Sequence, residues 1–92
     1  MTDLVFEIWR DANGQGQSMM QVTRQGDAVR KATMPGAVLL HSFTATSDFE
    51  AFQKNHDWNG FRRWRPEPDW IERMFTDDEA AEQQAYLANR DA

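Results

Sequence analysis

The chain contains no cysteine. This absence excludes disulfide bonds, thiolate metal sites and cysteine nucleophiles, and it suits a reducing compartment. Residues 1–7 carry no lysine or arginine, and no long apolar stretch follows them, so the sequence predicts no secretory signal. We therefore expect a cytoplasmic protein.

Long apolar runs and basic clusters are missing as well. The longest aliphatic run, residues 37–40, falls far short of the ~20 residues that a transmembrane helix needs. The net charge is −5, and residues 71–92 hold most of the acidity, with two Lys or Arg against six Asp or Glu. Nucleic-acid binders gather Lys and Arg on one face to neutralise phosphates, and no segment of this chain does so. We expect neither a membrane nor a nucleic acid as a partner.

The composition is that of a small folded domain. Hydrophobic residues make up 40% of the chain and aromatic residues 12%, which is typical of folded rather than disordered sequences. Ninety-two residues are enough for one small core but not for two. Residues 1–92 are therefore predicted to form a single domain.

Partial alternation of apolar and polar residues indicates a β-hairpin at the start of the chain. Residues 4–10 are rich in β-branched and aromatic side chains, as strands are. A glycine-containing turn over residues 11–17 leads to a second predicted strand over residues 18–24. Residues 37–44 begin with four apolar side chains and predict a third strand that is central and covered on both faces.

Two capping-box patterns predict two helices. The first begins at Ser47 and predicts a helix over residues 48–58. The second begins at Thr76 and predicts a helix over residues 77–89, which has few apolar side chains to bury and is expected to be peripheral. Residues 25–36 predict at most one helical turn, because a proline and a glycine end the stretch.

These elements predict an α+β fold. A three-stranded antiparallel sheet, made of the N-terminal hairpin and one further strand, would carry one packed helix. An irregular loop rich in aromatic residues and proline would then lead to the C-terminal helix.

The most informative stretch is residues 56–70, which holds three of the four tryptophans, three arginines and two of the three prolines. Trp and Arg are the side chains that most often dominate binding energy at interfaces. Trp also supplies much of the volume of a small core. The stretch is therefore either an exposed platform or a cover over the core. A mixed arrangement would bury Trp58 and Phe61 and expose Trp64.

We expect a non-enzymatic protein-interaction module that binds another protein or a second copy of itself through this stretch. Aromatic contacts would combine with arginine contacts to an acidic or carbonyl-rich partner surface. The residues predicted to bind the partner are Arg62, Arg63, Trp64, Arg65 and Trp70.

An alternative function is a small-molecule binding protein or an enzyme with a pocket between sheet and helix. Such pockets are largely apolar, with a few placed polar groups, and here a histidine would supply the polar group. The residues predicted to line this pocket are His41, Phe49, Phe52, His56 and Trp58.

Signatures of cofactor, metal or catalytic sites are missing. The glycine-rich residues 13–17 lack the lysine and the following helix of a phosphate-binding loop. No serine lies in a nucleophile motif, and the two histidines show no metal-ligand spacing. We predict no cofactor, no metal and no catalytic residue.

The predicted sheet has two edges, and unpaired edges invite strand addition by another chain. Met19 and Met20 belong to the second strand of the hairpin, and methionines make adaptable contact surfaces. A homodimer is therefore a further expectation.

Overall fold

The central element of the fold is the strand β1 (Leu4–Arg10). In the computed structural model, which describes residues 2–90, β2 (Gln17–Gln21) and β3 (Val38–Ala45) pair with β1 on either side. Both pairings are antiparallel, and the strand order is β2-β1-β3. The α+β class and the three-stranded antiparallel sheet predicted from the sequence are confirmed.

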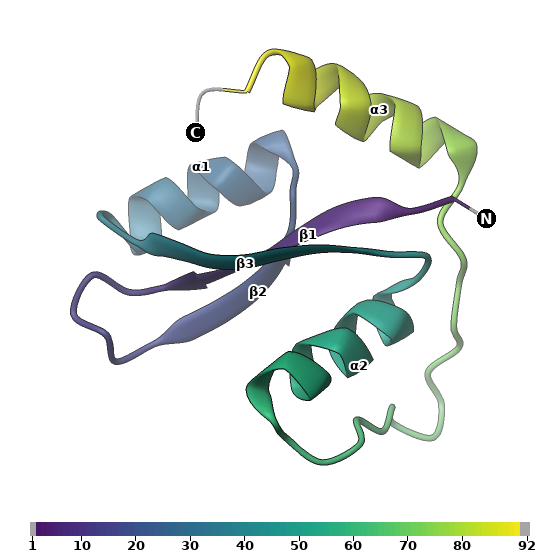
Figure 1. Ribbon diagram of the computed structural model, residues 1–92. Helices are drawn as coiled ribbons and strands as arrows, with labels where there is room; N and C mark the ends of the chain where they lie inside the picture. The colour runs from purple at the N-terminus through teal and green to yellow at the C-terminus, as the bar shows by residue number, and fades with distance from the viewer. Residues whose placement is uncertain (1, 91–92) are drawn as a thin grey trace.

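Three helices cover the two faces of this sheet (Figure 1). α1 (Arg24–Thr33) and α3 (Asp77–Ala88) lie on one face, and α2 (Asp48–Asn59) lies on the other. Each helix begins at a side-chain oxygen that accepts a hydrogen bond from a backbone N–H of the first turn, which stabilises a helix end. These capping residues are Thr23, Ser47 and Thr76.

The apolar core lies between the sheet and α2. Leu4 and Phe6 of β1 are buried there together with Ala51 of α2 and Phe75. The ring of Phe6 stacks on that of Phe43 with centroids 5.7 Å apart, and it meets the ring of Phe75 at 5.9 Å. The side chains that β1 directs to this face are therefore apolar, as the alternation of a strand requires.

The opposite face of β1 is polar, and one amide side chain attaches α3 to it. Gln83 accepts a hydrogen bond from the N–H of Val5 at 2.8 Å and donates to the carbonyls of Val5 and Val22 at 2.9 and 3.0 Å. Val22 in turn donates from its N–H to the carbonyl of Val5. The Gln83 amide thus takes the place of the last bond in the ladder between the two strands. The buried side of α3 is polar, whereas Ala81 and Ala85, which were expected to be buried, are exposed.

Two local predictions were wrong. α1 is a full helix of ten residues rather than a single turn, because Thr23 caps it and Gly26 is accommodated within it. β3 is an edge strand rather than the central one, and Val38 and Leu39 are nearly half exposed. Its apolar run spans a register shift opposite Ile8 and Trp9, where alternation along the strand breaks.

No helix within residues 2–90 is both long and apolar enough to cross a membrane.

Replacing Gln83 with alanine should leave the N–H of Val5 and the carbonyl of Val22 without partners in a buried environment. Because each such group costs about 1–3 kcal/mol, we expect the free energy of unfolding to fall by roughly 2–4 kcal/mol, as measured by urea denaturation. Gln84→Ala, at the exposed neighbouring position, should change it by less than about 0.5 kcal/mol. An equal loss in the two variants would show that the inserted amide contributes nothing specific.

Candidate functional site

The predicted interaction stretch belongs to a longer segment, residues 61–75, that runs back along α2 and is called the return segment here. Gly60 ends α2 in a left-handed conformation, with φ of 74°, which glycine adopts without strain. The chain then reverses, and its first residues bond to the end of the helix. Phe61 donates from its N–H to the carbonyl of His56 at 2.9 Å, and the His56 Nδ1 lies 2.9 Å from the carbonyl of Arg62.

Further contacts hold the return segment along the whole length of α2. In the middle of the helix, the Gln53 side chain accepts a hydrogen bond from the N–H of Trp64 at 3.0 Å. At the start of the helix, Ser47 donates to the carboxylate of Glu72 and forms an isolated β-bridge with Met74. The segment is therefore an ordered part of the structure, although it contains no helix or strand.

Trp64 is the aromatic centre of this arrangement. Its ring lies 5.1 Å from that of Phe49 and 4.9 Å from that of Phe52, both on α2. On its other side the ring of Trp70 lies 6.4 Å away. Trp64 is half-buried, so it holds the segment to the helix and supports Trp70, which is 53% exposed.

The mixed arrangement expected from the sequence is therefore reversed. Trp58 and Phe61, expected to be buried, are 42% and 61% exposed, whereas Trp64 is partly covered. The return segment and the adjoining part of α2 expose an unusual amount of apolar side chain for so small a protein. The exposed residues are Phe52, Trp58, Phe61, Trp70, Ile71 and Met74.

The predicted arginines lie beside these rings and are all exposed. Among residues 2–90, no carboxylate forms an ion pair with Arg62, Arg63 or Arg65. Arg73, at the end of the same segment, differs, because its guanidinium makes two bonds of 2.8 and 3.1 Å to Glu79. The three arginines are thus available to a partner's carboxylates.

The five residues of the alternative pocket do not enclose a space. The His41 ring stacks on that of Trp58 at 5.1 Å, and His56 meets Phe61 edge to face at 5.5 Å, while Phe49 and Phe52 fill their space with Trp64. The three cavities found in the described part of the chain are lined by α1 or α3, and none by these five residues.

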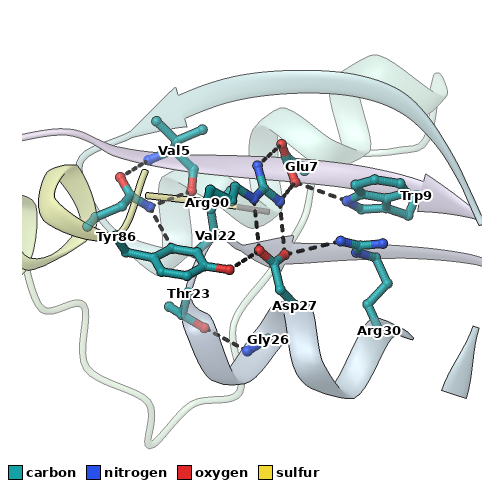
Figure 2. A network of polar contacts seen from close by, with 11 residues as sticks. Val5, Glu7, Trp9, Val22, Thr23, Gly26, Asp27, Arg30, Tyr86 and Arg90 are labelled. Carbon is teal, nitrogen blue, oxygen red and sulfur yellow. Dashed lines mark hydrogen bonds and ion pairs between the residues drawn. The ribbon is translucent and has the colours of Figure 1, made fainter. Parts of the chain in front are cut away.

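A buried charged network on the other face of the sheet was not predicted (Figure 2). Arg90 makes two hydrogen bonds to Glu7 of β1, at 2.6 and 2.8 Å, and two to Asp27 of α1, at 2.8 and 2.9 Å. Tyr86 donates its hydroxyl to the same Asp27 carboxylate. The indole N–H of Trp9 donates to Glu7 at 3.1 Å.

Arg30 completes this network from above the Trp9 ring. Its guanidinium lies 3.8 Å from the ring centroid, in cation–π contact, and makes one long contact of 3.4 Å to Asp27. Its Nε is buried and has no hydrogen-bond acceptor. The indole face therefore compensates a cation that the carboxylates hold only weakly.

The two carboxyl groups of the network are held in their ionised form. The hydrogen bonds from Arg90 lower the pKa of Glu7 despite its burial. Burial alone would raise the pKa of Asp27, but the bonds from Arg90 and Tyr86 outweigh it and bring that pKa to about 2. Carboxylates with low pKa values and fully engaged oxygens are poor general bases. The network is structural.

Little in the sequence could have revealed this network. Glu7, Asp27 and Arg90 lie far apart in the chain and follow no motif. The only signal was Glu7 itself, a charged residue within an otherwise apolar strand, since a buried charge requires a partner. Among residues 2–90, no group of three or more His, Asp or Glu side chains is placed to hold a metal ion.

Comparison with known proteins gave no match to any protein-family model, curated protein or solved structure. The function is therefore argued from the geometry alone.

Replacing Arg90 with alanine should leave Glu7 and Asp27 buried without their main cation. We expect the free energy of unfolding at pH 7 to fall by about 3–5 kcal/mol, as is typical when one partner of a buried pair is removed. Arg73→Ala, which breaks only the exposed pair with Glu79, should have little effect.

The same network predicts how stability depends on pH. Both carboxyl groups have folded-state pKa values below their ordinary values of 4.5 and 3.8, so they stabilise the fold above about pH 4.5. This stabilisation should be lost as the pH falls toward 2. Denaturation of Arg90→Ala over the same range should show a much smaller loss. Identical pH profiles for the two proteins would contradict the assignment.

The four tryptophans should differ in the hydrogen exchange of their indole N–H groups. Trp9 is 8% exposed and donates to buried Glu7, so its indole should exchange at least about 100-fold more slowly than that of Trp70. Two-dimensional NMR with Trp→Phe substitutions for assignment measures these rates. Equal protection of Trp70 and Trp9 would show that Trp70 is covered.

Proposed function

We propose that this protein is a non-enzymatic interaction module that docks a partner protein onto the return segment. One observation carries the proposal. The segment is hydrogen-bonded to α2 from end to end, yet several of its rings and three of its arginines point to solvent without a partner in the described chain. A structural role explains the contacts of Trp64 but not the exposure of Trp70 or Phe61.

The order of the segment favours binding. Association costs free energy for every side chain and loop that must be immobilised, and a surface already held in place avoids much of that cost. Pro66 and Pro68 further restrict the backbone between the two stacked tryptophans. Trp70 and the neighbouring arginines can therefore meet a partner with little additional ordering.

The chemistry of the segment points to an acidic partner surface with an apolar hollow. Arg62, Arg63 and Arg65 offer planar guanidinium groups that bind carboxylates in a bidentate manner. Trp70 offers a large ring, and such rings in desolvated pockets dominate many interfaces. The absence of cysteine supports a reducing compartment such as the cytoplasm as the place of this interaction.

The alternative of a small-molecule binding protein or enzyme finds less support. Its five proposed residues fill one another's space, and the cavities that exist lie on the other face of the sheet.

Selection from a displayed library of random twelve-residue peptides tests the proposal. We expect enriched peptides to combine Asp or Glu with a bulky apolar residue and to bind more weakly as salt rises. Arg63→Ala combined with Trp70→Ala should weaken the selected peptide by about 10- to 100-fold in calorimetry, since each such truncation commonly costs more than ~1 kcal/mol.

The matched control removes one exposed arginine and one exposed apolar side chain from α1, in Arg24→Ala combined with Val29→Ala. It should leave the affinity unchanged. Failure to enrich any peptide, or an equal loss of affinity in both double variants, would count against the return segment as the binding site.

A further inference from the structure

The two edges of the sheet are protected to very different degrees. On β3, the side chain of Lys54 donates to the carbonyl of Thr44 at 2.7 Å. Just beyond the strand, the carbonyl of Thr46 accepts from the N–H of Phe75, and the N–H of Thr46 donates to Glu50, both at 2.9 Å. A lysine and a covering segment are common means of preventing strand addition. The β3 edge is therefore largely closed.

The β2 edge has no such cover. The hydrogen bonds from Val22 to Val5 and from Asp11 to Gly16 mark the two ends of the hairpin ladder. Alternate residues of an antiparallel ladder bond to the partner strand, so those between them direct their N–H and C=O groups outward. The outward residues of β2 are Gln17, Met19 and Gln21. No hydrogen bond within the described chain reaches their outward backbone groups.

The outward residues of β2 are self-complementary. They read Gln, Met, Gln, so a two-fold axis at Met19 sets Gln17 of one copy opposite Gln21 of the other. Each of the three opposed pairs could exchange two backbone hydrogen bonds. β2 contains no charged residue, so identical strands meet without like-charge repulsion. A two-fold contact requires this kind of surface, one that matches its own copy.

A groove beside β2 provides apolar surface for the same contact. It lies between β2 and α1, has a volume of about 410 Å³, and is lined by Met20, Val29 and Met34 among others. Val29 is 53% exposed. In the paired arrangement Ser18 of one copy lies opposite Met20 of the other, on the same face as α1. The two grooves would therefore adjoin across the joint.

We propose that the protein forms a two-fold dimer through antiparallel pairing of β2 with β2 of a second copy. The product is a continuous six-stranded sheet with both α1 helices on one face. Five residues span only about 17 Å, and stable dimers bury about 800 Å² on each partner. The dimer is therefore weak, with a dissociation constant on the order of 10–100 µM.

Two charge variants test this pairing and its register. Gln17→Lys combined with Gln21→Lys sets lysines opposite each other at both ends of the joint. Gln17→Lys combined with Gln21→Glu sets each lysine opposite a glutamate. Both variants lose the hydrogen bond between Gln17 and Asn59, so their effects on the monomer are matched. Sedimentation velocity from about 5 µM to about 1 mM protein measures the dimer.

We expect the native chain and the Lys/Glu variant to dimerise and the Lys/Lys variant to bind at least about tenfold more weakly. A native chain that stays monomeric at every concentration overturns the proposal, as does equal dimerisation or equal failure of the two variants. Amide hydrogen exchange in the native chain gives an independent measurement, because the N–H groups of Met19 and Gln21 should become protected as concentration rises. Exchange at these two amides that does not change with concentration also overturns it.

Discussion

The guanidinium of Arg90 is the contact on which one side of this protein depends. Four hydrogen bonds join the end of the described chain to β1 and α1 at once, and the two carboxylates involved are 63 and 83 residues away. Little apolar packing holds α1 and α3 to the sheet, since their buried side chains are Asp27, Arg30 and Gln83. Directional polar bonds therefore do on this face what apolar burial does under α2.

Polar and apolar faces stabilise a fold in different ways. The core between the sheet and α2 gains from every apolar atom removed from water, and it tolerates small shifts of its rings. The network of Glu7, Asp27 and Arg90 tolerates none, because a partly satisfied buried network is costly. A buried ion pair adds little net stability compared with apolar packing, but it strongly disfavours arrangements that leave a charge alone. The network thus specifies where α1 and α3 sit.

The sequence allowed the elements to be predicted where local rules decide them. Alternation located β1, and the side-chain caps at Ser47 and Thr76 located α2 and α3. α1 was underestimated because its glycine and the following Pro35 were read as breakers, although the helix ends before the proline. The apolar run of β3 was read as a central strand, whereas a register shift disturbs its alternation at an edge.

The candidate site was predictable in part. Its residue types pointed to residues 56–70, but which rings are covered depends on how the return segment lies along α2. That path is decided by single bonds such as the one from Trp64 to Gln53, which no sequence pattern announces. The buried network was beyond reach for the same reason, since its members meet only when all three helices are in place.

The contact between Trp64 and Trp70 has a consequence for how the protein can change over evolution. The two rings close the base of residues 65–69, which are fully exposed and make no contact with the apolar core. Lengthening a loop whose ends are held costs only about 0.6 kcal/mol for each doubling. The tip can therefore accept insertions and new side chains while the sheet below is unchanged, so the part of the chain that recognises a partner can diversify independently of the part that keeps it folded.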